Sequence, residues 1–180
     1  MVRSRTILQA AILCVASTAE AEDSNTSFDF FRRHCLSSGP DFDRTVRAAQ
    51  AHGWTPLGDE VVIGLAPVDD PESIEGWVAQ GNGIGQPLFV GVAKNNLGGK
   101  SVQACTVATS GVDSRGFERQ LFDVFDAEAI DENRSPTHVH KLYSVIVKGR
   151  NELVTLTVPA APDGRDQLMA SSIAETQWEN

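Results

Sequence analysis

The hydrophobic positions of the chain first become regular near residue 28, where their spacing is helical. Phe28, Phe31 and Cys35 lie at i, i+3 and i+7, so they share one stripe of a helix. Such a stripe is normally buried against the rest of a domain. We therefore expect a helix here whose Phe and Cys side chains face the core.

A second amphipathic helix is predicted directly after the first. Residues 39–41 (Gly-Pro-Asp) break the first helix, and Gly53 suits the left-handed position that ends many helices. Trp54 then follows, where it can pack back on the last turn. The apolar stripe of this second helix is Phe42, Val46 and Ala49.

Later runs of apolar and β-branched residues predict strands. Residues 88–94 and 102–109 are separated by a short turn rich in Asn and Gly, as are residues 141–148 and 152–158, so we expect two β-hairpins. The β-branched residues of segment 61–65 predict a fifth strand.

Further helices are expected between these strands. The apolar spacing after Asp70-Pro71 predicts a short helix, and the spacing after Asp113 and Ser114 predicts a longer one. Segment 126–136 is acidic and polar, so we predict an exposed loop there. Segment 163–177 is predicted to form the last helix. The fold predicted is α+β: a mostly antiparallel sheet of about five strands with helices packed on it and one disulfide.

The N-terminal residues have the pattern of a secretory signal rather than of folded structure. Arg3 and Arg5 precede an apolar segment, residues 7–16, and Ala19-Glu20-Ala21 is a small-x-small cleavage motif. We expect residues 1–21 to be a signal peptide and residues 22–180 to form a single domain, periplasmic or secreted. Cys14 follows Leu13, where a lipoprotein signal has a small residue, so no lipid anchor is predicted.

The mature chain is expected to be strongly acidic. The full chain has 15 Lys and Arg against 24 Asp and Glu, and removal of Arg3, Arg5 and Glu20 leaves 13 against 23, a net charge of −10. Such a charge argues against nucleic acid and against anionic membrane surfaces as partners, and it suits a cationic envelope protein or ligand.

Two cysteines, Cys35 and Cys105, remain after cleavage in a compartment that should be oxidising. Only one intramolecular pairing is possible, and closing a loop of about 70 residues would stabilise the fold by roughly 4 kcal/mol. Strand alternation places Gln103, Cys105 and Val107 on one face, which we expect the helices to cover. A pair of catalytic or metal-binding thiols is the alternative, although their separation matches no CxxC motif.

Three features of the chain occur together: an aromatic residue before a cysteine, an Ala-rich helix that ends in Gly-Trp, and a later Cys-Thr-Val strand. The residues concerned are Phe31, Cys35, Ala49, Gly53, Trp54 and Cys105. In these features the chain resembles small exported proteobacterial proteins of unassigned function. The resemblance covers the N-terminal half of the mature chain best and implies a periplasmic location and a disulfide, with no activity to transfer.

The strongest chemical candidate is a pair of histidines, His138 and His140. Residues i and i+2 of a strand point to the same face, so both imidazoles could bind one metal ion. A third ligand would be needed, and Asp126, Asp131 and Glu132 are close in sequence. The alternative is a solvated surface pair at the edge of a polar loop.

No familiar nucleophile or metalloprotease motif occurs in the mature chain, and the sequence predicts no catalytic residue and no cofactor. Two hypotheses follow. The first is a non-enzymatic periplasmic protein that binds another envelope component as an inhibitor, immunity or accessory protein. The second is a small metal-dependent hydrolase that uses His138 and His140.

Overall fold

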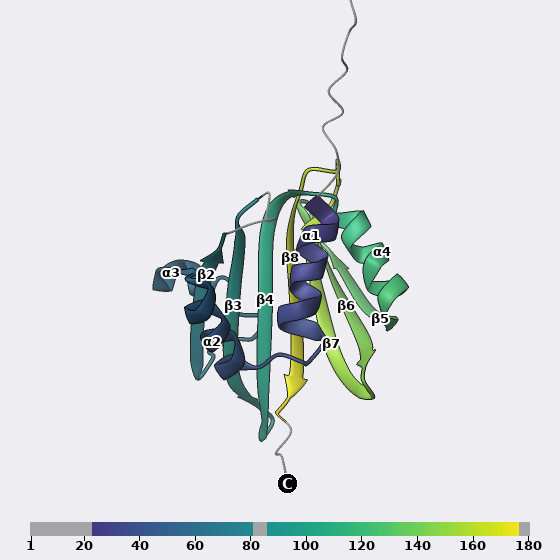
Figure 1. Ribbon diagram of the computed structural model, residues 1–180. Helices are drawn as coiled ribbons and strands as arrows, with labels where there is room; N and C mark the ends of the chain where they lie inside the picture. The colour runs from purple at the N-terminus through teal and green to yellow at the C-terminus, as the bar shows by residue number, and fades with distance from the viewer. Residues whose placement is uncertain (1–22, 81–85, 177–180) are drawn as a thin grey trace, which may run out of the picture.

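The computed structural model describes residues 23–80 and 86–176 (Figure 1). The predicted signal peptide lies outside these residues, so its prediction remains open. The described chain forms an eight-stranded antiparallel sheet, with helices α1, α2 and α4 on one face and the short helix α3 beside β2. The α+β class is therefore confirmed.

The sheet has the strand order β1-β2-β3-β4-β8-β7-β6-β5. Strand β8 lies between β4 and β7, so it joins two meanders into one sheet. The strands are β1 (Thr55–Pro56), β2 (Ser73–Ala79), β3 (Leu88–Leu97), β4 (Lys100–Val112), β5 (Asp126–Arg134), β6 (His138–Val147), β7 (Arg150–Pro159) and β8 (Asp166–Glu175).

The helices are α1 (Asp23–Phe31), α2 (Phe42–His52), α3 (Asp59–Ile63) and α4 (Ser114–Val124), and a π-helical turn, η1 (Arg32–Leu36), continues α1. The predicted ends of α2 are confirmed. Asp41 accepts a hydrogen bond from the backbone N–H of Arg44 at 2.7 Å, and Gly53 is left-handed with φ of 63°. Trp54 donates its backbone N–H to the Ala49 carbonyl, which closes the last turn.

The main core lies between the helices and the sheet. Phe28 and Phe31 of the first helix contact Phe117 of α4, with ring centroids 5.3 and 5.8 Å apart. Beneath them, alternate residues of the central strands are buried. These sheet residues include Val90, Val92, Cys105, Val107, Val154, Leu156 and Ala170.

Both predicted hairpins are present, as β3 with β4 and β6 with β7. The prediction of about five strands was wrong, because β1, β2, β5 and β8 were not expected and segment 61–65 is not a strand. Segment 61–65 belongs to helix α3 and the turn that follows it. There Val62 and Leu65 are buried against the sheet by a helical turn rather than by strand alternation.

Three predicted elements have the wrong type. Strand β2 was expected to be a short helix and β8 a last helix, because their apolar residues satisfy a helical period as well as a strand period. Each forms backbone hydrogen bonds with neighbouring strands, and this tertiary pairing decides between the two. Strand β5 was expected to be a loop, because most of its side chains are exposed and acidic; its pairing with β6 makes it a strand.

Candidate functional site

The sheet has two unlike faces. Cys105 points toward η1, so the residues that share its face across the register, such as Val92, Ser172 and Val154, form the helix-bearing face. The opposite side is called the open face here. Its residues on the last three strands in chain order are His138, His140, Leu142, Ser144 and Ile146 of β6, Asn151, Leu153, Thr155 and Thr157 of β7, and Gln167, Met169, Ser171 and Ile173 of β8.

A segment around α3 covers part of the open face, over β2 and β3. Leu65 lies against Gly91, where an added Cβ would be 2.8 Å from the Leu65 Cβ, so only glycine permits this close approach. Asn95 donates its Nδ2 hydrogen to the Asp69 carbonyl at 2.9 Å, which fixes the end of the segment. Segment 64–69 thus stands as a wall beside the uncovered strands β6, β7 and β8.

Within the described chain, pockets follow one another along β7 and β8. The first pocket has a volume of about 390 Å³ and the middle pocket about 410 Å³, and both include Thr157 and Met169 in their linings. The first pocket is mainly apolar, with Leu65, Phe89, Ala108 and His138 around it. The middle pocket is more polar and is lined by Pro67, Asp69, Asp131, His140, Thr155 and Ser171, among others.

A third pocket, of about 690 Å³, lies at the other end of the same strands. Its apolar lining includes Leu153, which is 39% exposed, and Ile173. Ile146, on the neighbouring strand β6, is 44% exposed. The open face therefore presents apolar and hydroxyl side chains that the described chain leaves partly accessible to solvent.

Charge is distributed unequally between the two faces. By strand alternation, Lys94, Lys141 and Arg150 belong to the helix-bearing face. Among the described strand residues of the open face, Lys100 is the one Lys or Arg, and it pairs with Glu175 at 2.5 Å. The acidic side chains Asp126, Glu128 and Asp131 of β5 share the open face.

Lys141 illustrates this segregation, because its backbone borders the middle pocket while its side chain bonds on the other side of the sheet. Its ammonium contacts both carboxylate oxygens of Glu118, at 2.8 and 2.7 Å. The Tyr143 hydroxyl donates to the same carboxylate. Burial and this hydrogen bond raise the pKa of Tyr143 well above its usual value. The group fastens α4 to β6 and leaves the middle pocket without the Lys141 charge.

The two histidines singled out from the sequence share the open face, as predicted, but border different pockets. His138 Nδ1 is 2.9 Å from the Thr137 hydroxyl, and His140 Nδ1 is 3.0 Å from the Thr157 hydroxyl. Of the suggested third ligands, Asp131 borders the pocket of His140. No group of three His, Cys, Asp or Glu side chains within residues 23–80 and 86–176 is arranged to hold a metal ion.

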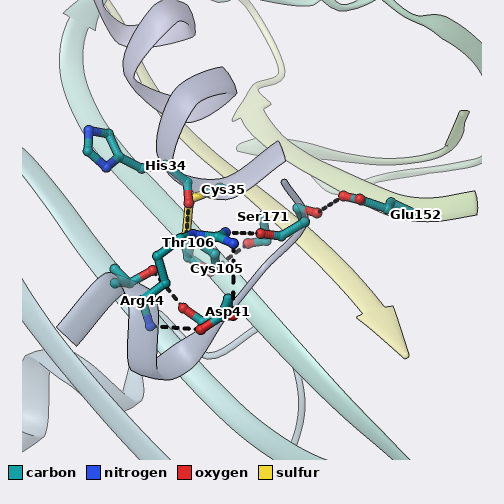
Figure 2. The surroundings of a disulfide bond; sticks show 11 residues. His34, Cys35, Asp41, Arg44, Cys105, Thr106, Glu152 and Ser171 are labelled. Atoms are coloured by element: carbon teal, nitrogen blue, oxygen red, sulfur yellow. Dashed lines mark hydrogen bonds and ion pairs between the residues drawn. A yellow bond between two sulfur atoms is a disulfide. The ribbon is translucent and has the colours of Figure 1, made fainter. Parts of the chain in front are cut away.

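Cys35 and Cys105 form a disulfide, with sulfur atoms 2.01 Å apart and Cα atoms 5.1 Å apart (Figure 2). Both residues are fully buried, so the bond ties η1 to the centre of the sheet. Nearby, the buried carboxylate of Glu152 accepts hydrogen bonds from Ser172 at 2.8 Å and Arg150 at 3.0 Å. Burial raises the pKa of Glu152 despite these two partners.

A further histidine, His34, lies in an aromatic cluster on the helical side of the molecule. Its ring centroid is 4.3 Å from that of Phe30 and 5.4 Å from that of Trp54. The pKa of His34 is lowered to about 4, mainly by burial of the ring and to a smaller extent by the positive charge of Arg33. His34 is therefore neutral at pH 7 and packs as an aromatic ring.

Comparison with known protein families, curated proteins and solved structures finds no match to this chain. None of the helices in the described part of the chain is long and apolar enough to cross a membrane. The open face itself was missed by the sequence reasoning. It depends on β8 being a strand between β4 and β7, and β8 gives little sign of this, because residues 169–173 read Met-Ala-Ser-Ser-Ile without alternation. A sequence signal is present in β7, where apolar and hydroxyl residues alternate over residues 154–157.

Proposed function

We propose that the mature chain is an exported, non-enzymatic protein that binds another envelope component through the open face of its sheet. The observation that carries this proposal is the row of pockets over strands whose apolar side chains are partly exposed. The second face of an antiparallel sheet is normally solvated and polar, so partly exposed apolar side chains on the open face indicate an interaction site.

The chemistry of the pocket linings favours binding over catalysis. Hydroxyl and aliphatic groups predominate, and His138 and His140 each bond to a threonine. The acidic balance of the whole chain, with a net charge of −9 including the signal segment, favours a cationic partner. Inhibitor, immunity and accessory roles all fit such a surface.

Site-specific photo-crosslinking in the periplasm tests the proposal. A photoreactive phenylalanine analogue at Thr157 or Ile173, both on the open face, should yield an adduct with the same partner. The same analogue at the exposed Arg47 of α2 or Arg119 of α4 serves as the matched control. Equal adducts from all four positions, or none from the open face, would contradict the proposal.

Metal analysis separates this function from the hydrolase alternative. The proposal expects protein purified from the periplasm to contain no stoichiometric zinc and to be unaffected in metal content by His140→Ala. Stoichiometric zinc that is lost on His140→Ala would favour the hydrolase instead.

A further inference from the structure

The pockets of the open face form a row too long for one small molecule. Strand β8 has 10 residues, and at about 3.3 Å per residue it extends for roughly 33 Å. Gln167 and Met169 border the first pocket, Met169 and Ser171 the middle pocket, and Ile173 and Glu175 the third. An occupant that uses all three must be extended.

The middle pocket differs from its neighbours in charge. Asp69 comes from the wall segment and Asp131 from β5, so two acidic residues from separate elements border one pocket. Asp131 uses Oδ1 to accept the backbone N–H of Glu132 at 2.9 Å. The Lys141 ammonium is held on the other side of the sheet by Glu118, so it does not neutralise this pair.

The flanking pockets both offer apolar side chains for contact, although the third also has polar residues in its lining. In the first pocket, Leu65, Phe89 and Met169 surround a space whose titratable side chain is His138 alone. In the third pocket, Leu153 and Ile173 line the floor, and the charges of Lys100 and Glu175 are already paired with each other. The row therefore places two acidic residues between pockets that each offer apolar side chains, although the third pocket also has a substantial polar lining that includes Asn151 and Thr176.

We infer that the partner presents an extended polypeptide segment, which lies along β7 and β8 with a lysine or arginine side chain in the middle pocket and apolar side chains in the pockets on either side. In an extended chain, alternate side chains point the same way, so a basic residue flanked by apolar residues at alternate positions matches this order. Asp69 and Asp131 are both exposed, and two acids that border one pocket together attract such a cation more strongly than either acid alone. This inference rests on the proposed binding function and names the kind of partner.

A second copy of this chain is a poorer occupant. The β5 edge beside the middle pocket carries Asp126, Glu128 and Asp131, and apposing two such edges brings like charges together. The same acids attract a cationic segment. Charge complementarity thus selects a basic partner over self-association.

Selection from a displayed library of random ten-residue peptides tests the inference directly. The oxidised mature protein is the target, and the Thr157→Trp variant, whose indole would fill the junction between the first and middle pockets, is used for counter-selection. Selected peptides should carry lysine or arginine with leucine, isoleucine, valine or phenylalanine at alternate positions. Ile173→Trp provides a second blocking variant if Thr157→Trp does not fold.

The affinity of a selected peptide for two charge-removing variants then shows whether its basic residue binds in the middle pocket. The double variant Asp69→Asn/Asp131→Asn should weaken binding about tenfold at low salt, because it removes both carboxylates. The control Asp43→Asn/Asp123→Asn removes the same charge from α2 and α4 on the helical side and should leave affinity nearly unchanged.

Several results would overturn the inference. One is an equal loss of peptide affinity in the control variant Asp43→Asn/Asp123→Asn. Others are selection of acidic or uncharged peptides, or no enrichment of peptides on the mature protein relative to Thr157→Trp. Dimerisation of the protein through the open face would also contradict it. If these occur while photo-crosslinking at Thr157 still captures one partner, the proposed binding function stands and only the extended cationic segment is wrong. If the open-face adducts are also missing, both fail.

Discussion

Removal of the disulfide by the double variant Cys35→Ala/Cys105→Ala should lower the free energy of unfolding by about 4 kcal/mol. The bond joins residues separated by 70 positions. For a loop of this length the chain-entropy relation gives roughly 4.4 kcal/mol at 25 °C. Both side chains are fully buried between η1 and β4, so loss of two sulfur atoms adds a small packing cost. Residual structure in the unfolded chain acts in the other direction, and a range of about 2–5 kcal/mol covers these terms.

Urea unfolding at 25 °C and pH 7, followed by tryptophan fluorescence, measures this change. Trp54 and Trp77 are buried, so unfolding exposes both indoles. Wild-type protein treated with a reductant is the matched control and should unfold close to the double variant. The variant should also have a somewhat larger dependence on urea, because its unfolded chain expands further without the crosslink. A loss below about 1 kcal/mol in both samples would refute the argument from loop closure.

The remaining predictions concern processing and pH. Intact-mass measurement of periplasmic protein should show Glu22 as the first residue, and retention of Met1 would contradict export. Because the pKa of His34 falls from 6.5 to about 4 on folding, the unfolded chain binds the extra proton, and stability should be lost as pH falls through this interval. An NMR titration of the His34 ring gives its pKa directly, and His34→Gln should reduce the pH dependence of stability; a midpoint near 6.5 would contradict the burial argument. For Glu152 the shift is upward from 4.5, so its contribution is fully present below pH 4.5 and is lost as pH rises through the raised pKa. Urea unfolding across this range should show that loss in wild type and not in Glu152→Gln; equal loss in both would contradict it.

Local sequence patterns were sufficient to predict the secondary structure of segments that contain their own turn and capping residues. Gly53 and Trp54 end α2 as their sequence predicts, and the Asn- and Gly-rich turns correctly indicate both hairpins. The covered face of β4 was also predictable, because alternation puts Cys105 on the same side as Val107. These features depend on residues close together in the chain.

Elements without such local signals were predicted wrongly. The apolar residues of β8 fit a helix and a strand equally well, and the choice follows from open hydrogen-bonding positions on β4 and β7. Strand β5 has an almost wholly exposed, acidic sequence, so backbone pairing with β6 is its main reason to be extended. Neither reason is visible before the sheet is assembled.

The sequence by itself determined the acidic charge and correctly predicted the disulfide partners, the two hairpins and the shared face of His138 and His140, because composition, the pairing of the two cysteines that follow the predicted signal, and strand alternation need no tertiary information. Only the tertiary structure decided that Asp69 and Asp131, 62 positions apart in the sequence, border one pocket. It also decided that the Lys141 charge lies on the opposite side of the sheet from them. The physical reason is that a pocket is formed by the surfaces of several elements, and the insertion of β8 between β4 and β7 brings these elements together.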